Sequence, residues 1–270
     1  MSVNLSSMKT AFVGCGNMGA AIVRGLVGKG IVPAASISCV DKIDDNVVRL
    51  ANDCGVVPKK TIAEACAVSD VIVVAVKPQG IEPVLAEIKD SRSKARFCIS
   101  VAAGVTLGRL KAGVGSSFKV ARVMPNVPAL VGRGIAGIYS DEPDAATLAE
   151  EMFKAVGDAV VLEAESQIDT VTGVSGSGPG FIFLAMDALV EGGVKMGLPR
   201  EIAQKLAAYT VAGAGEVAIS TGKAPLELRD MVASPGGTTL AGLAVLEQKA
   251  FHAALVDAVE AATRRSRELG

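Results

Sequence analysis

Residues 10–19 restrict the fold of this chain more than any other segment. Thr10–Val13 is a short apolar run that suits a buried strand, and a helical pattern begins at Ala20. Between them a GxGxxG pattern places Gly14, Gly16 and Gly19. In such a unit the first glycine permits a tight turn, the second lets the backbone approach a pyrophosphate, and the third lets the helix pack closely on the strand. The segment therefore predicts a dinucleotide bound at the free N–H groups of the helix's first turn, with a purely structural glycine turn as the alternative.

The overall composition argues against several classes of function. The 270 residues carry a net charge of −1 and show no basic run, so neither nucleic acid nor an anionic membrane surface is an expected partner. Aromatic residues make up only 3% of the chain and Trp is absent, so platforms that stack single-stranded bases are not expected. No stretch of about 18 apolar residues is free of charge, so no membrane span is predicted. The first residues lack an apolar core, so no signal peptide is predicted.

The residue patterns needed for a metal site or a catalytic triad are missing. The cysteines are Cys15, Cys39, Cys54, Cys66 and Cys98. An odd number without a CxxC pair or a nearby histidine predicts free thiols in a reducing cytoplasm. We expect Cys15, inside the glycine loop, to be a small filler residue. No metal site is predicted, because there is no HxxxH motif and no Asp-rich loop, and the single histidine, His252, rules out a Ser-His-Asp set.

Strand and helix patterns alternate over the first part of the chain. Strands are predicted at Thr10–Val13, Ile37–Val40, Val71–Val76 and Phe97–Val101. Helices are predicted between and after them, at Ala20–Val27, Asp45–Cys54, Ile62–Ala67 and Ile81–Ile88. This alternation favours parallel βαβ units in a doubly wound sheet. Weaker strand candidates at Lys119–Arg122 and Ile135–Tyr139, a helix at Ala145–Val156 and a strand at Ala159–Leu162 would extend it.

Strand signals end near Ser166, and long helical patterns replace them. Helices are predicted near residues 179–196, 199–220, 225–232, 235–248 and 250–267. We therefore expect an α/β Rossmann-like N-terminal domain with a parallel-core sheet at 8–165, followed by an all-α C-terminal domain at 166–270. The helix at 179–196 is apolar nearly all round and has to be buried. A homodimer or larger homo-oligomer is the favoured way to cover it, and burial against the first domain is the alternative.

The ends of three other predicted strands lie where ligands of parallel sheets bind. Asp41 ends the second strand, and its carboxylate is placed to accept a hydrogen bond from a ribose 2′-hydroxyl. This favours NADH, because the carboxylate would repel the 2′-phosphate of NADPH. The adjacent Lys42 could offset that repulsion. Val76-Lys77-Pro78 leaves the third strand, and Lys77 could reach the cofactor or remain a solvated loop residue. Val101–Gly104 leaves the fourth strand, where small residues would let nicotinamide lie close to the backbone.

An anion site is predicted at Ser234–Thr239 in the second half of the chain. Ser234 suits an N-cap and Pro235 the first helical position, while the following glycines leave N–H groups uncovered. A carboxylate would fit these groups, and Thr238 and Thr239 would add hydroxyl donors. The alternative is an ordinary helix cap.

These motifs, in this order, resemble pyrroline-5-carboxylate reductase. The resemblance runs from Met8 to about Leu269 and is most specific in Glu227–Leu240. The other matching motifs are Phe12–Gly19, Ala75–Pro78, Ser100–Thr106, Arg122–Pro128 and Gly173–Pro179.

The resemblance implies reduction of the cyclic imine Δ1-pyrroline-5-carboxylate to L-proline with NADPH or NADH, the last step of proline biosynthesis. It implies a Rossmann domain followed by a helical substrate-binding and dimerisation domain, in a homodimer that can assemble further, up to a decamer. The cofactor-binding positions it implies are Val13, Gly14, Cys15, Gly16, Asn17, Met18, Asp41, Val76, Lys77, Pro78 and Ala103. The substrate-binding positions are Glu165, Ser234, Gly237, Thr238 and Thr239, and Thr239 is the expected catalytic residue, hydrogen-bonded to the ring nitrogen.

The chain departs from the family pattern at two positions that bear on the choice of cofactor. Members that favour NADPH often carry small hydroxyl residues where Asp41 stands, and members often carry Asn where Ile62 stands. A β-hydroxyacid dehydrogenase is the alternative among oxidoreductases. Such enzymes usually carry a catalytic lysine on the first helix of the second domain, and here that helix offers only Lys195, near its far end. A non-catalytic protein that binds a nucleotide or pyridoxal phosphate is the alternative from another class.

Overall fold

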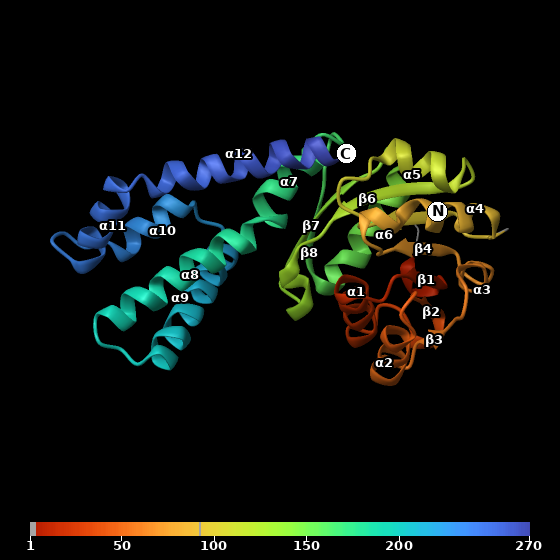
Figure 1. Cartoon of the computed structure of the whole chain (residues 1–270), viewed down its shortest axis with the longest axis horizontal. Coiled ribbons are helices and arrows are strands. Elements are labelled where there is room, and N and C mark those ends of the chain that lie inside the picture. Colours follow the sequence, from red (N-terminus) through yellow and green to blue (C-terminus); the bar gives the residue numbers. More distant parts are fainter. Residues whose placement is uncertain (1–3, 92) are drawn as a thin grey trace. The chain divides into compact units, whose positions relative to one another are not determined.

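The computed structural model describes residues 4–91 and 93–270, whose helices and strands are labelled in Figure 1. By its internal contacts the chain forms two compact units. The first unit ends at Gly176 and also contains Ala262–Gly270, and the second unit is Ser177–Ala261. Residues 166–176, which follow the predicted domain boundary, therefore pack with the first unit.

An eight-stranded sheet forms the centre of the first unit. Its strands are β1 (Thr10–Val13), β2 (Ile37–Val40), β3 (Val57–Pro58), β4 (Val71–Val74), β5 (Phe97–Ser100), β6 (Lys119–Met124), β7 (Gly134–Tyr139) and β8 (Gly157–Val161). They lie in the order β3-β2-β1-β4-β5-β6-β7-β8. Every pair from β3 to β6 is parallel, whereas β7 runs antiparallel to β6 and parallel to β8. The predicted α/β fold with a parallel-core sheet is confirmed.

Helices cover both faces of this sheet, and two apolar cores lie between the layers. The helices of the first unit are α1 (Asn17–Gly28), α2 (Asp44–Cys54), α3 (Ile62–Cys66), α4 (Ile81–Asp90), α5 (Leu107–Val114), α6 (Pro143–Phe153) and α7 (Gln167–Val171). One core contains buried residues of α1, α2 and α6, and the other contains buried residues of α3, α4 and α5. Successive residues of a strand point to opposite faces, so Phe12 of β1 enters the first core while Ala11 and Val13 enter the second.

The strand order creates a topological switch point beside β1. From β1 the chain continues to β2 and β3 on one side, and then crosses to β4 on the other side. In open parallel sheets ligands bind at the carboxyl ends of the strands next to such a point. The loops that leave β1, β4 and β5 therefore border the expected ligand site.

The second unit is helical, as predicted. Its helices are α8 (Gly178–Lys195), α9 (Arg200–Thr221), α10 (Pro225–Val232), α11 (Thr238–Gln248) and most of α12 (Phe251–Leu269). Its buried apolar cluster consists of Val190, Ala203 and Ala207, where α8 packs on α9. Such a small cluster leaves large apolar side chains exposed on both helices, among them Leu184 of α8 at 73% and Tyr209 of α9 at 74%.

One helical stretch among the described residues, Gln167–Lys195, is long and apolar enough to cross a membrane by length and composition, with a mean hydropathy of 1.3. It contains α7, a π-helical segment at Thr172–Gly176, and α8. The stretch carries the acidic residues Asp169, Asp187 and Glu191, so it is not free of charge.

Several predicted element boundaries need correction. Helix α11 begins at Thr238 and not at residue 235, so Ser234 is not the N-cap and Pro235 is not the first helical residue. Helix α5 and the two-residue strand β3 were not predicted. Strand β4 ends at Val74, because Ala75 and Val76 belong to the loop that follows.

Candidate functional site

The glycine loop lies at the carboxyl end of β1. Gly14 has a φ of +100°, and a Cβ atom at this position would lie 2.6 Å from the carbonyl oxygen of Ala75. A side chain is therefore opposed by both the backbone conformation and the available space. A Cβ on Gly16 would meet no atom within 4 Å, so the backbone there faces open space that a ligand can enter.

The first turn of α1 is open to an anion. Its N-cap, Gly16, makes no side-chain hydrogen bond, and the turn contains no acidic residue. Because the N–H of Ala20 bonds to the carbonyl of Gly16 at 2.9 Å, the N–H groups ahead of Ala20, such as those of Asn17 and Met18, have no partner within the helix. These groups and the positive end of the helix dipole fit the pyrophosphate of NAD(P)H.

Asp41 follows β2 and holds the glycine loop from the side. Its Oδ2 accepts the N–H of Cys15 at 2.6 Å, and its Oδ1 accepts the N–H of Ile43 at 2.9 Å. The carboxylate therefore lies beside the loop, where the sequence predicted it. Its contact with a ribose hydroxyl stays a prediction, but its backbone partners give it a role in fixing the loop that the sequence analysis did not foresee.

The loops after β4 and β5 present the other predicted cofactor positions at the same edge. The N–H of Ala75 donates to the carbonyl of Val13 at 2.8 Å, so Val76 starts directly beside the glycine loop. Lys77 is exposed, and Pro78 opens a short 3-10 turn. After β5, Ala103 is exposed.

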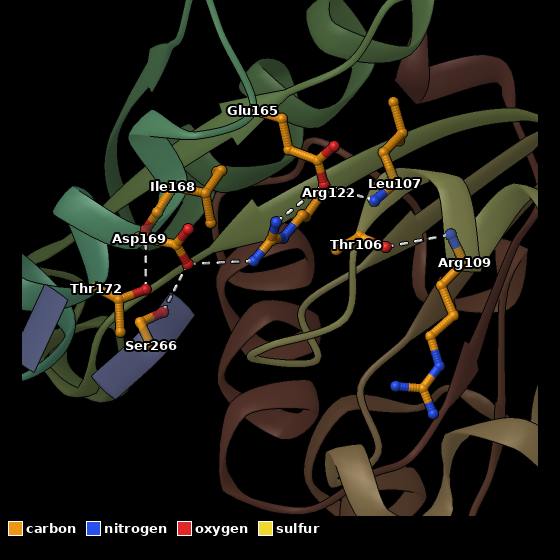
Figure 2. A network of polar contacts seen from close by, with 9 residues as sticks. All are labelled: Thr106, Leu107, Arg109, Arg122, Glu165, Ile168, Asp169, Thr172 and Ser266. Atoms are coloured by element: carbon orange, nitrogen blue, oxygen red, sulfur yellow. Dashed lines mark hydrogen bonds and ion pairs between the residues drawn. The ribbon is translucent and has the colours of Figure 1, made fainter. Parts of the chain in front are cut away.

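Glu165, a predicted substrate-binding residue, belongs to a buried polar network in the first unit (Figure 2). Its Oε1 accepts the N–H of Leu107 at 2.6 Å and Nη1 of Arg122 at 2.9 Å. Nη2 of Arg122 lies 3.8 Å from Oδ1 of Asp169, which in turn accepts the hydroxyl of Ser266 at 2.7 Å. Within the described residues, the two hydrogen bonds found at the Glu165 carboxylate both go to Oε1, which leaves Oε2 for a ligand.

The sequence analysis assigned no role to Arg122, Asp169 or Ser266. Arg122 and Ser266 are buried, with exposed fractions of 5% and 6%, and a buried guanidinium needs carboxylate partners. The only signal in the sequence was an arginine at the end of the predicted strand Lys119–Arg122, because its partners are distant along the chain.

The predicted anion site in the second unit is a tight turn followed by a helix start. The N–H of Gly237 donates to the carbonyl of Ser234 at 2.9 Å, and Gly236 has a φ of +70°. A proline followed by a glycine with positive φ is typical of a type II turn. Gly237 is then the N-cap of α11 and provides no side-chain bond, so the first N–H groups of the helix remain available beside Thr238 and Thr239.

The cysteines are free, and most of their thiols are held in the neutral form. Burial raises the pKa of Cys66 to about 11 and that of Cys98 to about 12. A hydrogen bond with Cys15, together with burial, raises the pKa of Cys39. Burial also raises the pKa of Cys54, which is only half-buried.

The described residues contain no group of three or more His, Cys, Asp or Glu side chains that could hold a metal ion. His252 lies exposed on α12. Lys195 is the last residue of α8, which is the position that the sequence analysis weighed for a dehydrogenase lysine.

Comparison with known proteins assigns both parts of the chain. Residues 165–269 match the family model described as pyrroline-5-carboxylate reductase dimerisation, and residues 9–104 match the model described as NADP oxidoreductase, coenzyme F420-dependent. The first match supports formation of a dimer, and the second supports the use of NAD(P)H.

Individual relatives match over the full length of the chain. Pyrroline-5-carboxylate reductase of Arabidopsis thaliana is 42% identical over 100% of this chain and 98% of its own length. The structure of a pyrroline-5-carboxylate reductase from Coxiella burnetii is 35% identical with a TM-score of 0.92, covering 98% of this chain and 99% of that one. The structure of Plasmodium falciparum pyrroline carboxylate reductase with NADP bound is 30% identical with a TM-score of 0.84, at the same coverage. The chain therefore belongs to the pyrroline-5-carboxylate reductase family.

Proposed function

We propose that this protein is an NAD(P)H-dependent oxidoreductase that reduces Δ1-pyrroline-5-carboxylate to L-proline. The observation that carries the proposal is the full-length match to pyrroline-5-carboxylate reductases, which spans both the open glycine loop and the Ser234–Thr239 turn. Both segments precede helix starts without a side-chain cap, and such N–H groups are suited to binding an anion, which supports the proposal.

The first unit supplies the cofactor site. Bound NAD(P)H provides the hydride that reduces the imine carbon. The N–H groups at the start of α1 bind its pyrophosphate, and the loops after β4 and β5 border the site at the switch point. Asp41 keeps the glycine loop in place through the N–H of Cys15.

The substrate carboxylate is proposed to bind at the start of α11. The N–H groups there and the hydroxyl of Thr238 are donors suited to a carboxylate, and Ser234 and Gly237 shape the turn around them. Glu165, whose Oε1 is fixed by two donors, would face the cationic ring nitrogen with its other oxygen.

Thr239 is proposed as the catalytic residue that hydrogen-bonds the imine nitrogen. A cyclic imine is electrophilic, and more so when its nitrogen is protonated, so the chain has mainly to orient it with the imine carbon about 3–3.5 Å from the hydride donor. A threonine hydroxyl is a weak acid. Its role is therefore to position the nitrogen and pass a proton, with water or a substrate that is already protonated as the proton source.

A direct assay tests this function. The purified protein is mixed with pyrroline-5-carboxylate and either NADH or NADPH, and the absorbance of reduced nicotinamide is followed together with the appearance of proline. We expect turnover with both cofactors and a higher kcat/KM with NADH, because the Asp41 carboxylate repels a 2′-phosphate. Absence of proline formation with either cofactor would overturn the proposed function, and a strong NADPH preference would remove only the role of Asp41.

The exposed apolar surface of the second unit is proposed to be covered by a second copy of the chain. Its side chains include Ile182, Phe183 and Leu184 of α8 and Leu206 and Tyr209 of α9. Glu201, Ile202, Lys205, Leu206 and Tyr209 share one open face of α9. The dimerisation match covers these helices, which favours a protein partner over a membrane for the apolar stretch Gln167–Lys195. Assembly of dimers into a decamer is part of the same proposal.

We further propose that the protein works in the cytoplasm. The support is chemical, because its five cysteines are free, as is usual for proteins of a reducing compartment.

A further inference from the structure

The loop Val101–Thr106 joins β5 to α5 at the edge of the sheet where the cofactor is proposed to bind. It contains small residues and an exposed Ala103, and Gly104 has a φ of +73°. Ala102 and Val105 are buried in the second apolar core, with exposed fractions of 4% and 1%, and hold the body of the loop. The other contacts that hold the loop lie at its two ends and at Gly104.

The far end of the loop is anchored by Glu165. Leu107 is the first residue of α5, and its N–H donates to Oε1 of Glu165 at 2.6 Å. The same oxygen accepts Nη1 of Arg122 at 2.9 Å, so the position of the carboxylate depends on the guanidinium (Figure 2).

The near end of the loop is anchored beside the same arginine. Arg122 on β6 is the register partner of Ser100, the last residue of β5. Ser100 is 1% exposed and Arg122 is 5% exposed, so both are enclosed by the fold. One buried side chain therefore lies next to the start of the loop and reaches its end through Glu165.

The middle of the loop is covered by the end of α12, which Arg122 also reaches. Nη2 of Arg122 lies 3.8 Å from Asp169, and Asp169 accepts the hydroxyl of Ser266 at 2.7 Å. Three residues further along α12, the carbonyl of Leu269 lies 3.3 Å from where a Cβ on Gly104 would be. The planar guanidinium bridges two carboxylates in different directions, which a lysine ammonium with its single nitrogen does not reproduce.

We propose that Arg122 is a positioning residue that fixes the Val101–Thr106 loop for binding of the nicotinamide cofactor. It acts through Glu165 at the far end of the loop and through Asp169 and Ser266 at the covering helix. The proposal rests on the NAD(P)H site of the proposed function and is independent of which imine is reduced.

Two single variants and their double variant test this role. Arg122→Lys keeps the charge but loses the planar fork, and Glu165→Gln keeps an acceptor for Leu107 but loses the charge. Amide hydrogen exchange of residues 101–107 and fluorescence titration of NADPH without substrate are measured on each. Arg109→Lys is the matched control, because Arg109 lies on α5 with Leu107 but is outside the network of Arg122. Arg109 pairs with Glu82 in solvent, and their side chains are 47% and 58% exposed.

We expect both single variants to speed exchange at Leu107 about tenfold or more and to raise the NADPH Kd about fivefold or more, with the control unchanged. In the double variant the losses should not add, since both changes break one network. In the kinetics the NADPH KM should rise more than kcat falls.

Unchanged exchange at Leu107, an unchanged NADPH Kd, or additive losses would each overturn the role of Arg122. If Arg122→Lys fails to fold, Ser266→Ala serves in its place, because it removes only the hydroxyl that restrains Asp169. It should then raise the NADPH Kd in the same direction, and no change would contradict the proposal. A protein that binds NADPH in this way but makes no proline would refute the proposed reaction and leave this inference standing.

Discussion

At the scale of single residues, the role of Thr239 decides whether Ser234–Thr239 is a substrate-binding turn or an ordinary helix cap. It is the second residue of α11 and is half-buried, while Thr238 beside it is exposed. We expect Thr239→Ala to lower kcat more than about tenfold, as the loss of a group that assists proton transfer does. The NADPH Kd should stay unchanged. Steady-state kinetics and a fluorescence titration check both expectations.

Thr239→Ser is the matched variant, because it keeps the hydroxyl and removes only a methyl group. It should retain most of the activity. If Thr239→Ala works nearly as well as the parent protein, then Thr239 takes no part in the reaction and the turn serves only to start the helix.

The thiols give a prediction that depends on pH. Burial raises the pKa of Cys54, so less thiolate is present at neutral pH than in a free cysteine, and the proportion grows as the pH rises. Because Cys54 is half-buried while the other cysteines are buried, we expect it to be alkylated first, slowly near pH 7 and faster toward pH 9. Mass spectrometry of iodoacetamide-treated protein measures the order of labelling, and preferential labelling of Cys66 or Cys98 would contradict it.

At the scale of elements, the turn between β1 and α1 tolerates no side chain at Gly14. Gly14→Ala forces a Cβ against the carbonyl of Ala75 and strains the positive φ, so we expect a loss of about 1–3 kcal/mol of stability and of most NADPH binding.

Gly28→Ala, at the last residue of α1, is the control, since a Cβ there meets no atom within 4 Å. It should leave NADPH binding intact and change the stability by less than about 1 kcal/mol. Thermal unfolding and NADPH titration distinguish the two variants. Equal behaviour of Gly14→Ala and the parent protein would show that the loop is not built as described.

The elements that the sequence predicted well are those whose signals are local. β1 and β2 have the predicted bounds because each is a short apolar run that ends at a turn signal. Helix α5 was not predicted, because Gly108 and Gly113 weaken its helical pattern. The start of α11 was predicted wrongly because Pro235 suits both a first helical position and a type II turn, and Gly236 with its positive φ selects the turn.

The candidate site follows the same rule. The glycine loop and the segments around Lys77 and Ala103 were predictable because each directly follows a strand of the sheet. The network of Arg122 was not, because Arg122 and Glu165 are separated by 43 positions and meet only when α7 and β6 pack in the same unit. Pairing between distant residues leaves no periodic trace in a single sequence.

At the scale of the whole molecule, a single chain exposes large apolar side chains on α8 and α9, and a partner protein would bury them. Leu184 is 73% exposed on α8, in the region that matches the dimerisation family. We expect Leu184→Glu to convert the dimer into a monomer, because a charge in an apolar interface has no partner. Light scattering after size-exclusion chromatography measures the mass.

Val48→Glu is the corresponding control on α2 of the first unit, where an apolar side chain is 54% exposed. It should leave the dimer intact. A dimer that survives Leu184→Glu would place the interface elsewhere on the chain.

The most direct measurement of the proposed chemistry is the transfer of a labelled hydride. Reduced nicotinamide cofactor in which both hydrogens on the hydride-donating carbon are deuterium is mixed with the protein and pyrroline-5-carboxylate, and the proline formed is analysed by mass spectrometry. We expect L-proline with one deuterium on the former imine carbon, and the same labelled product formed more than about tenfold more slowly by Thr239→Ala. Proline without deuterium, or no proline at all, would contradict direct hydride transfer at this site.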